Sequence, residues 1–291
     1  MNPVPYHRPA SLTEAIRLHG DHPGAQFVAG GTDVIVKMKS GTLAPSALIS
    51  IRNLAELRGV EVGPDGARIG AATPLEMVRT HAELQAGWPI LVDAVGRMAG
   101  VQIRNAGTLG GNLCNASPCA DAAPPLIALD AVFRLEGPDG VRRIEADAFF
   151  TGPGQTAGQP GEVLTHIELP PAMPSARGAF LRKQRVAMDL AQVNVAVWLE
   201  PGTADADPSD APSIQRVRIV AGAVAPTPLR LQEAEAIVLT GPPTPETFAA
   251  AGARAAELVS PITDIRATAA YRRHITGVLV RRGLEQCWSA R

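Results

Sequence analysis

The chain has 291 residues, of which 46% are hydrophobic and 19% are charged, and its formal net charge is −1. This length can bury a large core and suggests two domains. Because the charges balance, the sequence has no excess of basic residues of the kind that binds nucleic acid or an anionic membrane, so neither partner is expected.

Targeting and metal-binding signals are also missing from the sequence. The opening residues lack the basic start and apolar core of a secretory signal, and no apolar run approaches the roughly 18 residues of a membrane span. Cys114, Cys119 and Cys287 are too few and too scattered for a disulfide framework, a zinc site or an iron–sulfur site. No histidine has a partner at metal-ligand spacing. We therefore expect a reduced, cytoplasmic protein without a metal of its own.

The N-terminal part of the chain predicts a small α/β unit. Ser11 and Glu14 form a capping box that opens a short helix. The pair Gly30-Gly31 interrupts the next strand, and a helix is expected immediately after it. The expected elements are a helix over 11–20, a strand over 26–29, a helix over 33–40 and a strand over 47–51.

The middle of the chain predicts a hairpin, helices and further strands. Thr73 is expected to cap a helix, with Pro74 at its first position and Glu76 completing a capping box. Residues 106–121 carry almost no bulky side chain and are expected to form a bare loop. The other expected elements are a hairpin of strands 58–62 and 67–71, a helix over 88–99, an apolar stretch near 125–131, and strands over 132–136, 141–145 and 163–169.

The last third of the chain predicts strands followed by helices, which is an α+β layer. Residues 201–213 are rich in turn formers and are expected to form a surface hairpin loop or a disordered insertion. The expected elements are strands over 193–199 and 215–224 and helices over 229–239, 245–259 and 268–285.

Two pairs of adjacent glycines are the candidate binding elements. Glycine lets a ligand approach backbone N–H groups closely, so a diphosphate held between two such turns would explain both pairs. Asp121 would then suit the hydroxyls of a ribose. The alternative is that both pairs are plain bends. The first segment runs from Val28 to Asp33 and contains Ala29, Gly30, Gly31 and Thr32, and the second runs from Gly107 to Asn112 and contains Thr108, Gly110 and Gly111.

Other catalytic motifs are not found. There is no Walker A lysine motif, and no serine has a nucleophile-elbow context. The glycines of 152–158 belong to a loop with a proline and no following helix, which is not a dinucleotide fingerprint. A dinucleotide site without an obvious acid, base or nucleophile indicates a cofactor that performs its own chemistry.

Together the two glycine motifs resemble a known family. AGGTD at 29–33 and TLGGNLCNASPCAD at 108–121 are similar to the two FAD-binding signatures of the flavoprotein (medium) subunit of molybdenum hydroxylases. That family includes xanthine, aldehyde, nicotine and carbon monoxide dehydrogenases. The resemblance covers nearly the whole chain, because YHRP at 6–9, the segment 180–197 and the last helix also match in order.

Two differences from particular members of the family narrow the type of enzyme that the resemblance indicates. The carbon monoxide enzymes have histidine and serine after the first glycine pair, where this chain has Thr32 and Asp33. This favours a xanthine-, aldehyde- or heterocycle-type enzyme. The cysteine-rich insertion of 4-hydroxybenzoyl-CoA reductase has no match here, which disfavours that assignment.

The resemblance implies a fold and a site. The fold is a two-lobed FAD-binding domain of the vanillyl-alcohol-oxidase type over 1–175, with lobes of about 1–57 and 58–175, followed by a smaller α+β domain over 176–291. Ala29–Asp33 would wrap the diphosphate from one side, and Asp121 would contact the adenosine ribose. Met98 and Leu164 correspond to apolar residues against the flavin ring, although core packing explains them equally well. The other implied cofactor residues are Thr108, Gly110, Gly111 and Asn112 around the diphosphate, and Lys183 near the flavin.

The resemblance also implies partners. A large molybdenum subunit with a molybdopterin cofactor would hydroxylate the substrate, and a small subunit with two [2Fe–2S] clusters would relay electrons to FAD in this chain. The FAD would pass them to NAD or another acceptor, within a dimer of heterotrimers. The alternatives are a free-standing flavin oxidase acting on its own small substrate, and a binding or scaffold protein that has lost the cofactor.

Overall fold

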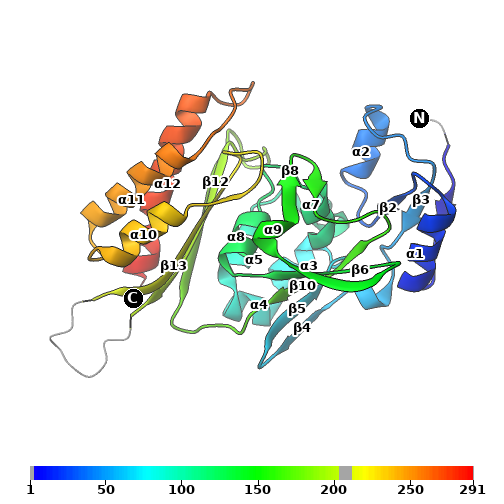
Figure 1. Cartoon of the computed structure of the whole chain (residues 1–291), viewed down its shortest axis with the longest axis horizontal. Helices are drawn as coiled ribbons and strands as arrows, with labels where there is room; N and C mark the ends of the chain where they lie inside the picture. The colour runs from blue at the N-terminus through cyan, green and yellow to red at the C-terminus, as the bar shows by residue number, and fades with distance from the viewer. Residues whose placement is uncertain (1–2, 203–211, 291) are drawn as a thin grey trace.

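The computed structural model describes residues 3–202 and 212–290. These residues form an elongated molecule with the N-terminal lobe at one end, a five-stranded sheet and its helices in the middle, and a four-stranded sheet at the other end (Figure 1). The α+β fold class is confirmed. The loop expected over 201–213 falls mainly on 203–211, outside the described residues.

The N-terminal lobe is built on a parallel sheet in the order β1-β3-β2. The Ser11 hydroxyl accepts a hydrogen bond from Glu14 N at 3.2 Å, which caps α1 as expected. The Glu14 carboxylate accepts from Ala10 N, one residue before the position that a capping box requires. The elements are β1 (Tyr6–His7), α1 (Leu12–Asp21), β2 (Gln26–Val28), α2 (Val34–Lys39), β3 (Leu48–Ser50) and the 3₁₀ helix η1 (Ala55–Leu57).

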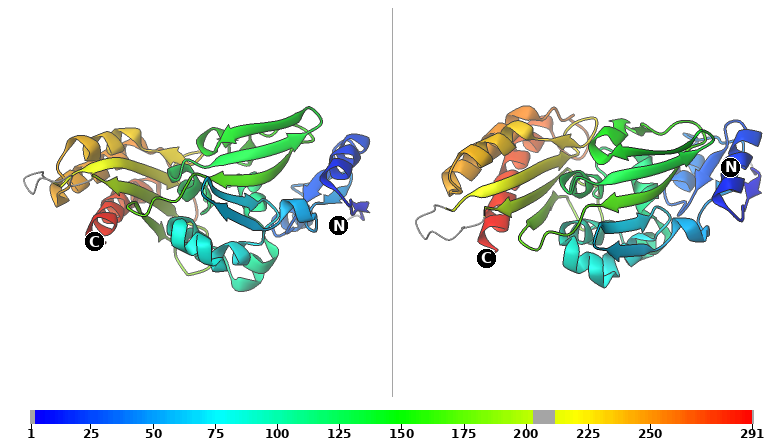
Figure 2. Two further views of the ribbon diagram at one scale, coloured as in Figure 1. Left: turned by 90° about the horizontal axis from the view of Figure 1, so that it is seen from below. Right: turned by 60° about the horizontal axis from the view of Figure 1, so that its bottom comes forward.

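The second lobe is an antiparallel sheet in the order β4-β5-β10-β6-β7, with helices packed on one face (Figure 2). Its core includes Phe133, Phe149 and Phe150, whose rings meet edge to face. The strands are β4 (Val60–Gly63), β5 (Gly66–Gly70), β6 (Val132–Gly137), β7 (Gly140–Glu145) and β10 (Val163–Leu169), with a small hairpin of β8 (Phe150–Gly152) and β9 (Gln155–Thr156). The helices are α3 (Leu75–Thr80), α4 (Ala82–Gly87), α5 (Pro89–Gly96), α6 (Val101–Ala106), α7 (Leu109–Asn115), α8 (Ala123–Ala128) and α9 (Ala146–Phe149).

The C-terminal part is an antiparallel sheet in the order β11-β12-β13-β14, covered on one face by three helices (Figure 1). Strand alternation assigns its two faces. In β12, Val195 and Val197 pack into the core under the helices, whereas Ala196 belongs to the core of the second lobe. The elements are β11 (Arg177–Lys183), β12 (Val193–Pro201), β13 (Ile214–Gly222), β14 (Leu229–Arg230), α10 (Gln232–Thr240), α11 (Pro245–Leu258) and α12 (Ala269–Ser289).

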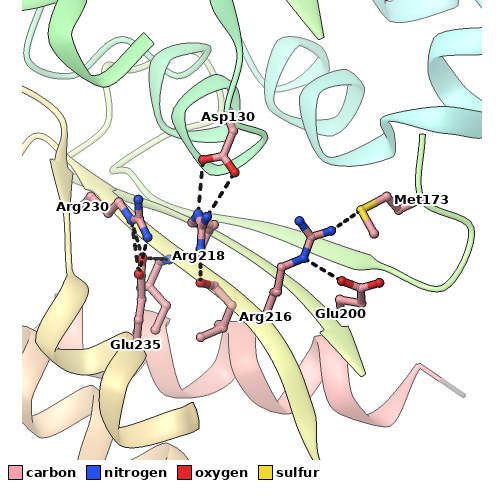
Figure 3. Close-up of polar contacts among 9 residues, drawn as sticks. Asp130, Met173, Glu200, Arg216, Arg218, Arg230 and Glu235 are labelled. Carbon is pink, nitrogen blue, oxygen red and sulfur yellow. Dashed lines mark hydrogen bonds and ion pairs between the residues drawn. The ribbon is translucent and has the colours of Figure 1, made fainter. Parts of the chain in front are cut away.

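A bidentate ion pair joins the C-terminal sheet to the second lobe (Figure 3). Arg218 on β13 donates from Nε and Nη2 to the two carboxylate oxygens of Asp130, each at 3.2 Å. Asp130 follows α8 in the left-handed conformation, with φ of 52°. Beside this pair, Glu235 accepts from Arg230 and from the buried Ile219 N. The Arg218–Asp130 pair joins β13 to the end of α8, where the apolar cores of the two parts meet, and the Glu235 bonds join α10 to β13 and β14.

The bare loop expected over 106–121 is wrong, because α7 lies within it. The Thr108 side chain accepts a hydrogen bond from Gly111 N at 3.0 Å and caps this helix. Ala116, with φ of 44°, ends it in the left-handed conformation. Two glycines lower the helix propensity of the segment, which hid the helix in the sequence.

The capping box expected at Thr73 is also wrong. The Thr73 hydroxyl exchanges hydrogen bonds with the backbone N and O of Gly59, at 2.9 and 3.0 Å. The Glu76 carboxylate is engaged by Arg79 and Arg104 instead of a helix N-terminus. The helix expected over 88–99 ends at Gly96, before the left-handed residue Ala99.

A buried histidine makes the fold sensitive to acid. His166 lies on the central strand β10 and is 8% exposed, and its Nδ1 has no hydrogen-bond partner among the described residues. Burial, with Arg68 and Arg134 nearby, lowers the pKa of His166 to about 4, although Glu61 opposes this. The unfolded chain therefore takes up this proton first, and stability is lost as the pH falls from about 6.5 towards 4.

We expect His166→Gln to weaken this acid sensitivity. Between pH 7 and pH 4.5 the parent chain should lose about 2 kcal/mol more unfolding free energy than the variant, measured by urea denaturation at both pH values. Equal losses in the two proteins would show that His166 does not titrate in the folded state as described.

Candidate functional site

A cavity of about 590 Å³ lies between the N-terminal lobe, the second lobe and the start of the C-terminal sheet. Its walls are the turn before α2, the segment from α6 to α7, and the connection between β11 and β12. Most of the site residues expected from the sequence line it. They are Ala29, Gly30, Gly31, Thr32, Asp33, Met98, Thr108, Gly111, Asn112 and Asp121.

The two glycine motifs touch each other through their backbones. A Cβ added to Gly30 would lie 2.2 Å from Ala106 O and 2.7 Å from Gly107 Cα. Gly31 has φ of +72°, which favours glycine. The first pair is therefore required both for the turn and for the close approach of the two lobes.

Gly110 has a packing role instead of lining the cavity. A Cβ at Gly110 would lie 2.5 Å from the Ala71 Cβ and 2.8 Å from Ala71 O, because α7 packs directly on the end of β5. Gly111 is the glycine of this pair that faces the cavity, and its N–H is bonded to the Thr108 hydroxyl.

A polar bridge connects the two lobes beside the cavity. Lys37 Nζ on α2 donates to Asn115 Oδ1 on α7 at 2.6 Å, and Asn115 Nδ2 donates to Asp33 Oδ1 at 3.3 Å. All three residues line the cavity. The Lys37 ammonium therefore supplies a positive charge next to the glycine turn, where an anionic ligand group would be stabilised.

Asp121 lies in a buried polar cluster that borders the cavity. Its carboxylate accepts from Asn194 Nδ2 at 2.7 Å and pairs with Arg182 Nη1 at 3.2 Å. Burial raises the pKa of Asp121 to about 6, against the opposing effects of Arg182 and Asn194. Arg182 also donates to the carbonyls of Arg97 and Asp189, so it ties the second lobe to the C-terminal sheet.

Two buried polar atoms at the cavity have no protein partner among the described residues. They are Asn112 Oδ1 and Arg182 Nε. Buried polar atoms are normally hydrogen-bonded, and leaving one unpaired costs about 1–3 kcal/mol. Both atoms belong to residues that line the cavity.

Leu164 and Lys183 were expected near the cofactor, but neither lines the cavity. Leu164 lies on β10 and is buried in the core of the second lobe. Lys183 lies one residue beyond Arg182, and successive residues of a strand point to opposite faces. The cavity therefore receives Arg182, and Lys183 belongs to the other face of β11.

Arg182, Asn194, Lys37 and Asn115 were missed in the sequence. The alternation of β11 and β12 contained a signal for the first two, because Arg182 pairs with Asn194 across the strands and both share a face with buried residues of the second lobe. Lys37 and Asn115 are far apart in the sequence, and no local pattern connects them. The structure shows no cluster of metal ligands within 3–202 and 212–290. Among these same residues, none of the helices has the length and apolar character needed to span a bilayer.

Comparison with known proteins identifies the family. Residues 2–172 match the family model described as the FAD binding domain in molybdopterin dehydrogenase. The chain belongs to this family. Residues 179–287 match a second model, the CO dehydrogenase flavoprotein C-terminal domain. The chain is thus similar over nearly all its length to the flavoproteins of molybdopterin dehydrogenases, and it is an FAD-binding oxidoreductase component.

Individual relatives agree with this assignment. The xanthine dehydrogenase FAD-binding subunit of Escherichia coli O157:H7 is 33% identical, over 98% of this chain and 96% of its own. The carbon monoxide dehydrogenase medium chain of Hydrogenophaga pseudoflava is 32% identical, over 98% and 96%. The solved structure of the carbon monoxide dehydrogenase from Hydrogenophaga pseudoflava superposes with a TM-score of 0.93 at 33% identity, covering 99% of both chains.

The cavity fits FAD, the cofactor of this family. Its glycine turns leave backbone exposed, Lys37 supplies positive charge, and the lining residues Asn112 and Arg182 each have a buried polar atom without a partner among the described residues. A dinucleotide offers the required combination of anionic phosphates, ribose hydroxyls and an apolar ring.

Proposed function

We propose that this chain holds one FAD in the cavity and transfers electrons within a molybdenum hydroxylase complex. The observation that carries this proposal is that residues of both FAD-signature motifs line one cavity, where the backbone of Gly30 meets Ala106 and Gly107, directly before the second motif, and where the Asp121–Arg182 pair also lies. FAD bound there would supply the redox chemistry, accepting electrons from one partner and releasing them to another.

The chain's own residues bind and orient the cofactor under this proposal. Ala29–Asp33 hold the diphosphate from the N-terminal lobe, and Asp121 accepts from the ribose of the adenosine half. Met98 packs against the flavin ring from the second lobe. The diphosphate residues contributed by the second lobe are Thr108, Gly111 and Asn112.

The partners follow from the relatives. Those proteins are named FAD-binding subunits or medium chains, which indicates larger and smaller companions. We propose a large subunit with the molybdopterin-type cofactor and a small subunit with two [2Fe–2S] clusters, in a dimer of heterotrimers. NAD is the proposed final acceptor. In support of FAD rather than a metal as the redox group of this chain, the cavity offers glycine turns and polar groups suited to a dinucleotide.

The test is anaerobic electron transfer in the complex purified from its native host. We expect three subunits with about one FAD per copy of this chain. Adding a substrate of the molybdenum subunit should bleach the flavin absorbance, and adding NAD⁺ should restore it. Retention of bleaching by this chain after removal of the other subunits would instead support a free-standing flavin oxidase. A bleached flavin that NAD⁺ leaves unchanged would overturn the proposed acceptor.

A further inference from the structure

A strained turn forms one wall of the cavity. Met98 and Ala99 line the cavity between α5 and α6, and Ala99 has φ of 43°. A non-glycine residue in this left-handed region is unfavourable and persists only where its surroundings hold it. The Cβ of Ala99 is therefore tolerated because other contacts fix the turn.

Arg104 supplies contacts that hold this turn. Its Nη1 donates to Met98 O and to Ala99 O, each at 3.0 Å. The side chain lies on α6 and is 14% exposed, so these bonds are shielded from water. Bonds from a charged donor to shielded carbonyls are stronger than neutral ones.

Glu76 in turn orients Arg104. Arg104 Nε donates to Glu76 Oε2 at 2.7 Å, while Arg79 donates to the other oxygen, Oε1. Bonds from Arg79 and Arg104 lower the pKa of Glu76 to about 2, so this carboxylate is ionised at neutral pH. The guanidinium of Arg104 thus has one edge fixed by Glu76 and the other directed at the turn.

We propose that Arg104, oriented by Glu76, is a positioning residue that holds the Met98–Ala99 turn in its left-handed shape and thereby fixes this wall of the FAD site. The inference rests on the proposed function for its ligand, because the cavity is the one assigned to FAD. The two residues, Arg104 and Glu76, lie outside both glycine motifs and were not among the expected site residues.

Arg79 provides a matched control. It pairs with the same carboxylate as Arg104 and carries the same charge, but its side-chain bonds go to Glu76 and none to the turn. Arg104→Met should raise the Kd for FAD at least about tenfold, the order expected when a charged hydrogen-bond donor is lost, and should alter the visible circular dichroism of bound flavin. Arg79→Met should change the Kd less than about twofold and leave that spectrum unchanged.

Two further variants test whether Arg104 affects FAD binding through the Met98–Ala99 turn. Arg104→Lys keeps the positive charge, but a lysine ammonium lacks the forked guanidinium that bonds Glu76 and both carbonyls at once. Part of the loss in FAD affinity should therefore remain in this variant. Ala99→Gly removes the backbone strain and should recover most of the affinity lost in Arg104→Met. No recovery would show that Arg104 does not act through the turn, and would overturn the proposal.

Hydrogen exchange of the chain without FAD separates this inference from the cofactor assignment. Peptides covering 96–107 should exchange faster in Arg104→Met than in the parent chain or in Arg79→Met. Equal exchange in all three proteins would overturn the positioning role, whether or not FAD binds. If the parent chain binds no FAD but the exchange difference appears, the proposed ligand is wrong and the positioning role stands.

Discussion

Replacing Gly30 by alanine is expected to abolish tight FAD binding and to lower the unfolding free energy by about 2–4 kcal/mol. The new methyl group would lie 2.2 Å from Ala106 O, and both partners of this collision are backbone, so the two lobes must separate. Separation moves the first glycine turn away from the second. The measurements are FAD titration and urea denaturation of the purified chain.

Gly20→Ala is the control for this substitution. Gly20 lies in α1, and no atom approaches an added Cβ within 4 Å. Alanine there should leave FAD binding unchanged and stabilise the chain by about 0.5–1 kcal/mol through helix propensity. If Gly30→Ala bound FAD as the parent does, the contact between the two motifs would not be required for the site.

Arg182→Met is expected to destabilise the chain by about 3–5 kcal/mol at pH 8, because it leaves the buried Asp121 carboxylate without its cation. Burial already raises the pKa of Asp121 to about 6, and loss of Arg182 raises it further. The acid is then neutral at pH 5, so the destabilisation should be smaller there than at pH 8. Urea denaturation at the two pH values measures the difference.

Two comparisons make this expectation specific. The double variant Asp121→Asn with Arg182→Met removes both charges, and it should be more stable at pH 8 than Arg182→Met alone. Arg185→Met breaks an ion pair with Asp189 in which the arginine side chain is 79% exposed, and it should cost less than about 1 kcal/mol. A pH-independent loss in Arg182→Met would contradict the buried pair as its cause.

Local patterns in the sequence predicted most of the helices and the long strands β10, β12 and β13, but not β11 or the short strands β1, β8, β9 and β14. The apolar run of β10 was expected at the same residues, Val163–Leu169, that the structure assigns. The Ser11 cap likewise located the start of α1, and the helix expected from 245 begins at that residue. These signals act within a few residues, so no tertiary information was needed.

The sequence could not assign individual roles to the glycines or to the buried polar residues. Gly30 and Gly110 are constrained by Ala106 and Ala71, which are distant in the sequence, so their packing roles required the fold. Thr73 and Glu76 matched a capping pattern, but tertiary partners bind their side chains instead. Lys183 was expected near the flavin, but its neighbour Arg182 lines the cavity, because a shift of one residue on a strand reverses the face.

Titration of the purified chain with FAD, followed by visible absorbance and by stoichiometry after denaturation, shows whether the cavity binds this cofactor. We expect saturation at about one FAD per chain, with the flavin released on unfolding, and loss of this binding in Gly30→Ala but not in Gly20→Ala. A parent chain that is colourless after incubation with FAD and removal of the unbound cofactor would contradict the assignment of the cavity, and the two glycine motifs would then serve only to pack the lobes together.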